Sequence, residues 1–113
     1  MKFVINSAKY RSSYFLDEDE LSLELDDIEK KLKKDMEKFL NAYPCLKEYG
    51  LEIREFLKKE DVSGFDEEKY YECTLPAIIE INTINELVEL SNKAKHKLIV
   101  NNNEIIIYDD YVE

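Results

Sequence analysis

The sequence has few of the side chains that most often carry out chemistry. It contains two cysteines, one histidine and two glycines, and no tryptophan. Nucleophilic catalysis needs a Cys or Ser beside a His, and the single His96 falls at the expected end of a helix. Cys45 and Cys73 form no C-x-x-C motif, and two glycines are too few for a phosphate-binding loop. We therefore expect no enzymatic activity and no bound cofactor or metal.

Long apolar runs are also missing. No stretch approaches the roughly 20 apolar residues of a membrane span, and the first residues lack the apolar core of a signal peptide. With 44% hydrophobic and 37% charged residues, the 113-residue chain fits one folded domain over residues 1–113. We expect a cytoplasmic protein that does not contact a membrane.

Acidic residues outnumber basic residues, 26 to 16, which gives a net charge of −10. Such a chain repels other polyanions, so we expect no direct binding to nucleic acid. The charges are segregated, because residues 1–16 hold three bases and no acid, whereas residues 17–29 hold eight acids and no base. Lysines follow at positions 30–38. The eight acids are Asp17, Glu18, Asp19, Glu20, Glu24, Asp26, Asp27 and Glu29.

Two interpretations of these acids are open. Carboxylates near a helix N-terminus and lysines farther along suit the helix dipole, and this accounts for residues 26–38. It does not account for residues 17–20, which precede the helix. Four adjacent carboxylates repel one another, so this run stays in solvent unless a basic partner meets it.

Apolar periodicity predicts two helices. The first begins at Asp26 or Asp27, with Asp26 and Glu29 as a capping box, and ends before Pro44. The second covers residues 84–96 and follows the capping-box pattern that Thr83 opens. Residues 21–25 fit either a strand or an earlier start of the first helix.

Strands are expected between and around these helices. Residues 2–10, 12–16 and 70–81 are rich in β-branched and aromatic side chains, with Pro76 at a sheet edge or bulge of the last of these. Residues 97–100 and 104–108 predict a hairpin turned by three asparagines. Residues 51–57 fit either a strand or a short helix. Residues 61–68 are expected to form a loop.

This order predicts an α+β fold over one domain. Each helix has a single apolar stripe, so both would pack on one face of a largely antiparallel sheet. The pattern resembles the ferredoxin-like β-α-β-β-α-β order with an extra C-terminal strand.

Tyrosines lie beside many of the acids. Tyrosine combines apolar area with a polar tip and is enriched at interface hot spots, and an acidic rim attracts a basic partner. Alternatively, one tyrosine of each neighbouring pair belongs to the core. The candidate partner-binding residues are Asp17, Glu18, Asp19, Glu20, Glu24, Tyr70, Tyr71, Tyr108, Asp109, Asp110, Tyr111 and Glu113.

Residue usage points to AT-rich coding, as in low-GC bacteria and their phages, because lysine outnumbers arginine 14 to 2 and there are 11 isoleucines and 8 asparagines. With the small size, the acidity and the tyrosine-carboxylate pairs, the chain resembles the phage-encoded inhibitors called anti-CRISPR proteins. The resemblance is one of type over the whole chain, without a shared motif. It implies a basic partner, a nucleic-acid-guided nuclease, whose DNA-binding or PAM-reading surface receives residues 17–20 or 108–113. The lysines at 30–38 depart from a uniformly negative DNA mimic.

We therefore expect a small acidic protein that inhibits a basic, nucleic-acid-handling protein. Two alternatives stay open. One is a self-assembling scaffold that uses a strand edge near Pro76 or the terminal hairpin, and the other is a sensor or sponge for a neutral or cationic small molecule. The sequence does not fix the oligomeric state.

Overall fold

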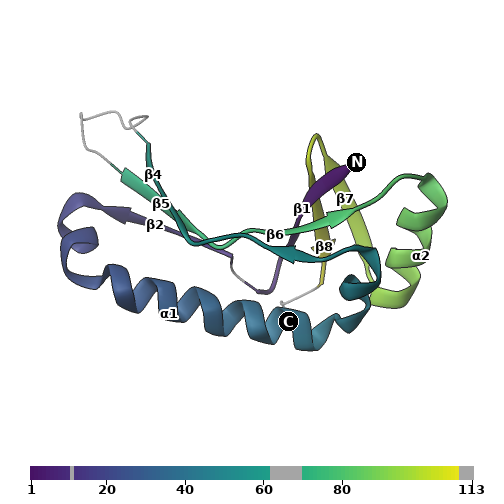
Figure 1. Cartoon of the computed structure of the whole chain (residues 1–113), viewed down its shortest axis with the longest axis horizontal. Helices are drawn as coiled ribbons and strands as arrows, with labels where there is room; N and C mark the ends of the chain where they lie inside the picture. Colours follow the sequence, from purple (N-terminus) through teal and green to yellow (C-terminus); the bar gives the residue numbers. More distant parts are fainter. Residues whose placement is uncertain (11, 62–69, 110–113) are drawn as a thin grey trace.

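Two β-sheets lie above one long helix (Figure 1). The computed structural model describes residues 1–10, 12–61 and 70–109, with the backbone alone over 15–25, 59–61 and 70. The chain is α+β, as expected. A five-stranded sheet has the order β3-β6-β1-β8-β7, and a three-stranded sheet the order β2-β5-β4. The strand bounds are β1 Lys2–Ser7, β2 Ser13–Asp17, β3 Glu52–Ile53, β4 Leu57–Asp61, β5 Tyr70–Thr74, β6 Ala77–Glu80, β7 Lys97–Asn101 and β8 Glu104–Tyr108.

The five-stranded sheet is mixed. β1 pairs in parallel with β8, whereas the other pairs in both sheets are antiparallel. The expected ferredoxin-like order is not confirmed, because the described strands divide between two sheets. The two long helices also pack in different places. Helix α1 lies against β2 and β5, and helix α2 against β7 and a short 3₁₀ helix, η1 (Pro44–Tyr49).

Helix α1 spans Glu18–Ala42. One stripe of it is buried, at Ile28, Leu32, Met36 and Phe39, which confirms the expected apolar spacing. The helix ends as expected before Pro44, but it begins eight residues before Asp26. The capping box predicted there is therefore wrong, and residues 21–25 are helical rather than extended.

The predicted strand over residues 70–81 is divided at Leu75 and Pro76. Its first half, β5, belongs to the three-stranded sheet and its second half, β6, to the five-stranded sheet. The segment over residues 52–61 divides in the same way into β3 and β4. The Arg54 backbone N–H, between these two strands, donates to the Pro76 carbonyl at 2.8 Å. Proline cannot donate to a strand ladder, so regular pairing stops where the chain passes from one sheet to the other.

Helix α2 spans Ile84–Ala94, with Thr83 as its N-cap. The Thr83 hydroxyl accepts a hydrogen bond from the Glu86 N–H at 3.2 Å, and the Glu86 carboxylate accepts one from the Asn82 N–H at 3.0 Å. The predicted helix is therefore confirmed, although it ends two residues before His96. Lys95 has a φ of 60° there, in the left-handed conformation that ends many helices.

We expect Thr83→Ala to lower the free energy of unfolding by about 1 kcal/mol, because the Glu86 N–H loses its acceptor at the helix start. Thr83→Ser keeps a hydroxyl in place and serves as the matched control. Urea denaturation followed by circular dichroism measures both variants. Equal losses for the serine and alanine variants would mean that the cap contributes nothing.

The hairpin of β7 and β8 is confirmed. Asn101 pairs with Glu104, and Asn102 has a φ of 46° in the tight turn between them. Asparagine tolerates this left-handed conformation better than most residues, which explains a tight turn without glycine. The hairpin adds β8 beside β1 and leaves β7 at the edge of the sheet.

Candidate functional site

The three-stranded sheet brings part of the acidic run next to the adjacent tyrosines. Its register aligns Asp17 of β2 with Tyr70 of β5, and Tyr70 with Asp61 of β4. The next row joins Leu16, Tyr71 and Glu60. These rows form one end of the sheet, and α1 begins there (Figure 1). We call this end the acidic tip, which comprises Asp17, Glu18, Asp19, Glu20, Glu60, Asp61, Tyr70 and Tyr71.

Three of the four acids that were expected to precede the helix lie within it. Asp17 ends β2, and Glu18, Asp19 and Glu20 form the first turn of α1. Carboxylates in the first turn interact favourably with the helix dipole, so part of their placement serves the helix itself. Glu24 lies one turn farther along the same helix, just beyond the acidic tip.

Tyr71 belongs partly to the core, as expected for one tyrosine of an adjacent pair. Its side chain is half-buried and packs against the apolar core, and the Lys58 ammonium lies 5.2 Å from the centre of its ring. Strand alternation places position 70 on the opposite face of β5. The two tyrosine positions thus lie on different faces of the sheet at the acidic tip.

The C-terminal candidates lie elsewhere. Tyr108 ends β8 in the five-stranded sheet and is 57% exposed, whereas Asp109 is only 3% exposed. The expectation that the Asp109 carboxylate faces a partner is therefore corrected. Asp110, Tyr111 and Glu113 lie outside the described residues. Residues 17–20 and Tyr108 do not share one surface, because residues 17–20 lie at the junction of β2 and α1, whereas Tyr108 ends β8 in the five-stranded sheet (Figure 1).

The Asp109 carboxylate joins three parts of the chain. It accepts hydrogen bonds from the Ser7 hydroxyl and the Tyr43 hydroxyl, both at 2.6 Å, and from the Lys9 backbone N–H at 3.0 Å. Burial alone would raise the pKa of Asp109, but these hydrogen bonds outweigh it and lower the pKa below its usual value. The pKa of Tyr43 is raised by burial and by its bond to the same carboxylate. Asp109 is thus an ionised structural group.

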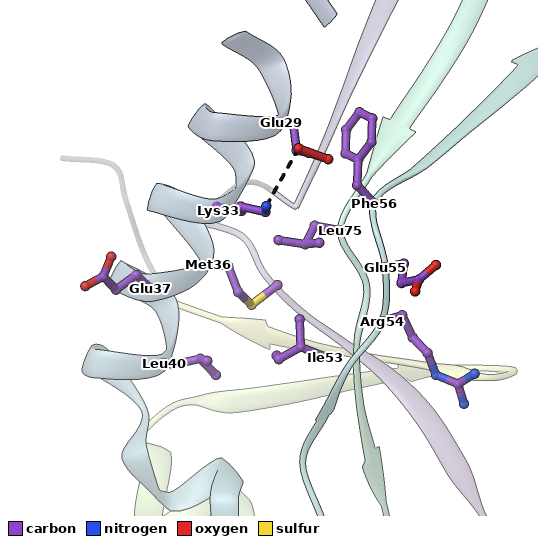
Figure 2. A pocket seen from close by; sticks show the side chains of 10 residues that line it. All are labelled: Glu29, Lys33, Met36, Glu37, Leu40, Ile53, Arg54, Glu55, Phe56 and Leu75. Carbon is purple, nitrogen blue, oxygen red and sulfur yellow. Dashed lines mark ion pairs between the residues drawn. The ribbon is translucent and has the colours of Figure 1, made fainter. Parts of the chain in front are cut away.

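A groove of about 500 Å³ lies between α1 and the segment that joins β3 to β4. Figure 2 shows Met36, Leu40, Ile53 and Leu75 pointing into it, with Phe56 at one end. An ion pair between Glu29 and Lys33 at 3.7 Å lies along the helix side. Sequence reasoning missed this groove, because three separate segments line it and its apolar lining residues, taken singly, resemble core residues.

The two cysteines and the single histidine pack as structural residues. Burial raises the pKa of the Cys45 and Cys73 thiols, which disfavours the reactive thiolate. The ring of His96 packs edge-on against that of Tyr43, with ring centres 6.1 Å apart. Over the described part of the chain, no three His, Cys, Asp or Glu side chains gather closely enough to hold a metal ion.

Comparison with known proteins gives no relative. No protein-family model matches the chain, and no curated protein or solved structure matches it significantly. Among the described helices, none is both long and apolar enough to cross a membrane. The function must therefore be argued from the chain's own residues.

Proposed function

We propose that this chain is a small binding protein that inhibits a basic, nucleic-acid-handling protein, and that the acidic tip is its contact surface. The observation that carries the proposal is the strand register, which aligns Asp17, Tyr70 and Asp61 at the end where α1 begins with three more acids. Acids far apart in the sequence thus gather beside two tyrosine positions.

The chemistry of the acidic tip suits competition with DNA. Asp17 and Asp61 are two strand spacings apart, about 10 Å, so the acids cover a patch rather than a point. Lysines and arginines that bind phosphates would bind such a patch of carboxylates, and the net charge of −10 would speed the encounter. An inhibitor of the anti-CRISPR type would act this way in the cytoplasm, by occupying a DNA-binding or PAM-reading surface.

The test removes four of the six negative charges of the acidic tip and keeps side chains of similar shape. The tip variant carries Asp17→Asn, Glu18→Gln, Asp19→Asn and Glu20→Gln. A matched control carries the same change of charge at four exposed acids outside the tip, through Asp26→Asn, Asp27→Asn, Glu37→Gln and Glu55→Gln. Circular dichroism checks that both variants fold, since the tip variant also removes favourable charges from the first turn of α1.

Each protein is immobilised and exposed to host extract, and retained proteins are eluted with increasing salt. We expect the wild type and the control to retain a basic DNA-binding protein that duplex DNA displaces. The tip variant should bind it at least about tenfold more weakly, because charge pairing across the contact is lost. Equal loss in both variants would show that only net charge matters. A retained protein that DNA fails to displace would contradict inhibition at a DNA-binding surface.

A further inference from the structure

Strand β7 is a free edge of the five-stranded sheet. All five of its residues pair with β8, and no described strand pairs with its other side. Every second N–H and C=O of β7 therefore points away from the sheet without a strand partner. Such a row of groups is a template for another strand.

The edge lacks the features that usually prevent such pairing. Charged residues, prolines, bulges, very short strands and a covering helix or loop protect edges in soluble proteins. Helix α2 contacts β7, yet four of the five β7 residues stay exposed. β7 reads K-L-I-V-N, with one charge at its start and unbroken pairing to β8. By contrast, the edge strand β4 reads L-K-K-E-D, with four charges, and the edge strand β3 has two residues.

Apolar side chains are exposed on both faces of this edge. Ile99 pairs with Ile106, whereas Val100 pairs with the buried Ile105, so Ile99 lies on the outer face and Val100 on the core face. Ile99 is 41% exposed and Val100 is 45% exposed. Exposed Tyr108 extends the apolar surface on the outer face. A strand added beside β7 would cover both faces.

We propose that β7 pairs with β7 of a second copy of this chain, antiparallel about a twofold axis at Ile99. This register is self-complementary. It sets Ile99 opposite its counterpart, Leu98 opposite Val100, and Lys97 opposite Asn101. All five residues pair, every outer-face side chain stays on the outer face, and the two five-stranded sheets join into one.

Charge complementarity favours a second copy over an unrelated strand. Asn101 of each copy is flanked on its own sheet by Glu104. Lys97 would thus lie two strand spacings, about 10 Å, from Glu104 of the second copy. One oxygen of the Glu104 carboxylate accepts a hydrogen bond from the Asn6 side chain of β1, so the lysine would approach the other oxygen. The twofold axis forms this pair twice. Lysine and glutamate are the only charged residues on the outer face of β7 and β8.

The net negative charge does not oppose this contact locally. Lys95 and Lys97 lie at the start of β7, whereas the acidic tip lies toward the other end of the long axis (Figure 1). Moderate salt should therefore leave the dimer intact or strengthen it by screening overall repulsion. Binding through the acidic tip should weaken in the same salt, so the two proposals can fail separately.

The test uses two edge variants of the whole chain. Ile99→Lys places two lysines side by side at the twofold axis. Ile53→Lys makes the same change on β3, at the opposite edge of the same sheet, where the native side chain is 42% exposed. Sedimentation velocity from micromolar to near-millimolar protein measures the mass. We expect the wild type and Ile53→Lys to approach twice the mass of one chain, and Ile99→Lys to dissociate at least about tenfold more readily.

Further measurements test whether the variants fold and whether β7 is the edge that pairs. Ile99→Thr keeps a β-branched side chain and removes apolar area, so it should weaken the dimer while circular dichroism stays unchanged. In the wild type, hydrogen exchange of the outward amides of β7 should slow as protein concentration rises. A wild type that stays monomeric over the whole range would overturn the proposal. So would loss of association in Ile53→Lys with none in Ile99→Lys.

Discussion

Asp109→Ala is expected to lower the free energy of unfolding by about 3 kcal/mol. The Ser7 hydroxyl, the Tyr43 hydroxyl and the Lys9 N–H all donate to this carboxylate. Each of these hydrogen bonds contributes about 1 kcal/mol, and more for the buried Tyr43 hydroxyl, which would lose its acceptor. The Lys9 N–H keeps the Ser7 hydroxyl oxygen as a second acceptor. Small domains have only about 5–15 kcal/mol of stability, so this one substitution would remove a large part of it.

Urea denaturation, followed by circular dichroism, measures the loss. Tyr43→Phe removes one of the three donors and keeps the ring, so it should cost less than Asp109→Ala. Asp109→Asn keeps the shape and one acceptor oxygen, so its loss in free energy of unfolding should lie between those of Tyr43→Phe and Asp109→Ala. If Asp109→Ala cost no more than Tyr43→Phe, the carboxylate would not join the three segments as described.

The Asp109 carboxylate should also make the free energy of unfolding depend on pH, in a direction that its pKa shift determines. The pKa of Asp109 is lower in the folded chain than its ordinary value, so the unfolded chain takes up the proton first on acidification. Its contribution to stability is therefore complete above about pH 4, the ordinary carboxyl range, and is lost as the pH falls through the folded pKa. Asp109→Asn should show a smaller acid destabilisation than the wild type. An unchanged pH profile would contradict the assignment.

Phe39→Ala is expected to lower the free energy of unfolding by about 3–5 kcal/mol, because it leaves a cavity in the core. Phe39 is almost fully buried on α1, with its ring centre 6.1 Å from that of Tyr10 and 5.7 Å from that of Tyr43. This ring cluster packs α1 against the segment that follows β1. Removing it affects the helix and that segment together.

Phe39→Leu keeps much of the apolar volume and should cost clearly less than the alanine variant. Val88→Ala, at an exposed site on α2, controls for the loss of an apolar side chain in general. Thermal and urea unfolding measure all three variants. A loss in Phe39→Ala no greater than that in Val88→Ala would show that the ring cluster does not support the core.

Local patterns predicted most elements but not how they assemble. The stripe Ile28, Leu32 and Met36 repeats at helical spacing, and Thr83 marks the start of α2, so both helices follow from short-range rules. Pro76 indicated only a sheet edge or a bulge within a single strand over residues 70–81, and did not predict that the strand divides there. That β5 and β6 belong to different sheets depends on the partners β2 and β1, which pairing rules alone do not select.

The candidate site was predictable only in part, for the same reason. The acidic run is evident from residues 17–20, but its alignment with Tyr70 is a long-range register. The burial of Asp109 did leave a signal. Ile105 and Ile107 are buried at alternate positions, and Asp109 continues that alternation by one step. Its charge and its neighbouring tyrosine suggested a surface group instead.

The parallel pair of β1 and β8 governs when the larger sheet can be completed during synthesis. Val4 pairs with Glu104, so β1 gains this neighbour only after residues 104–108 have been synthesised. Until then β1 can pair on one side only, with β6. Closing so long a loop is slow, so the nascent chain would carry an open apolar strand edge that chaperones could bind.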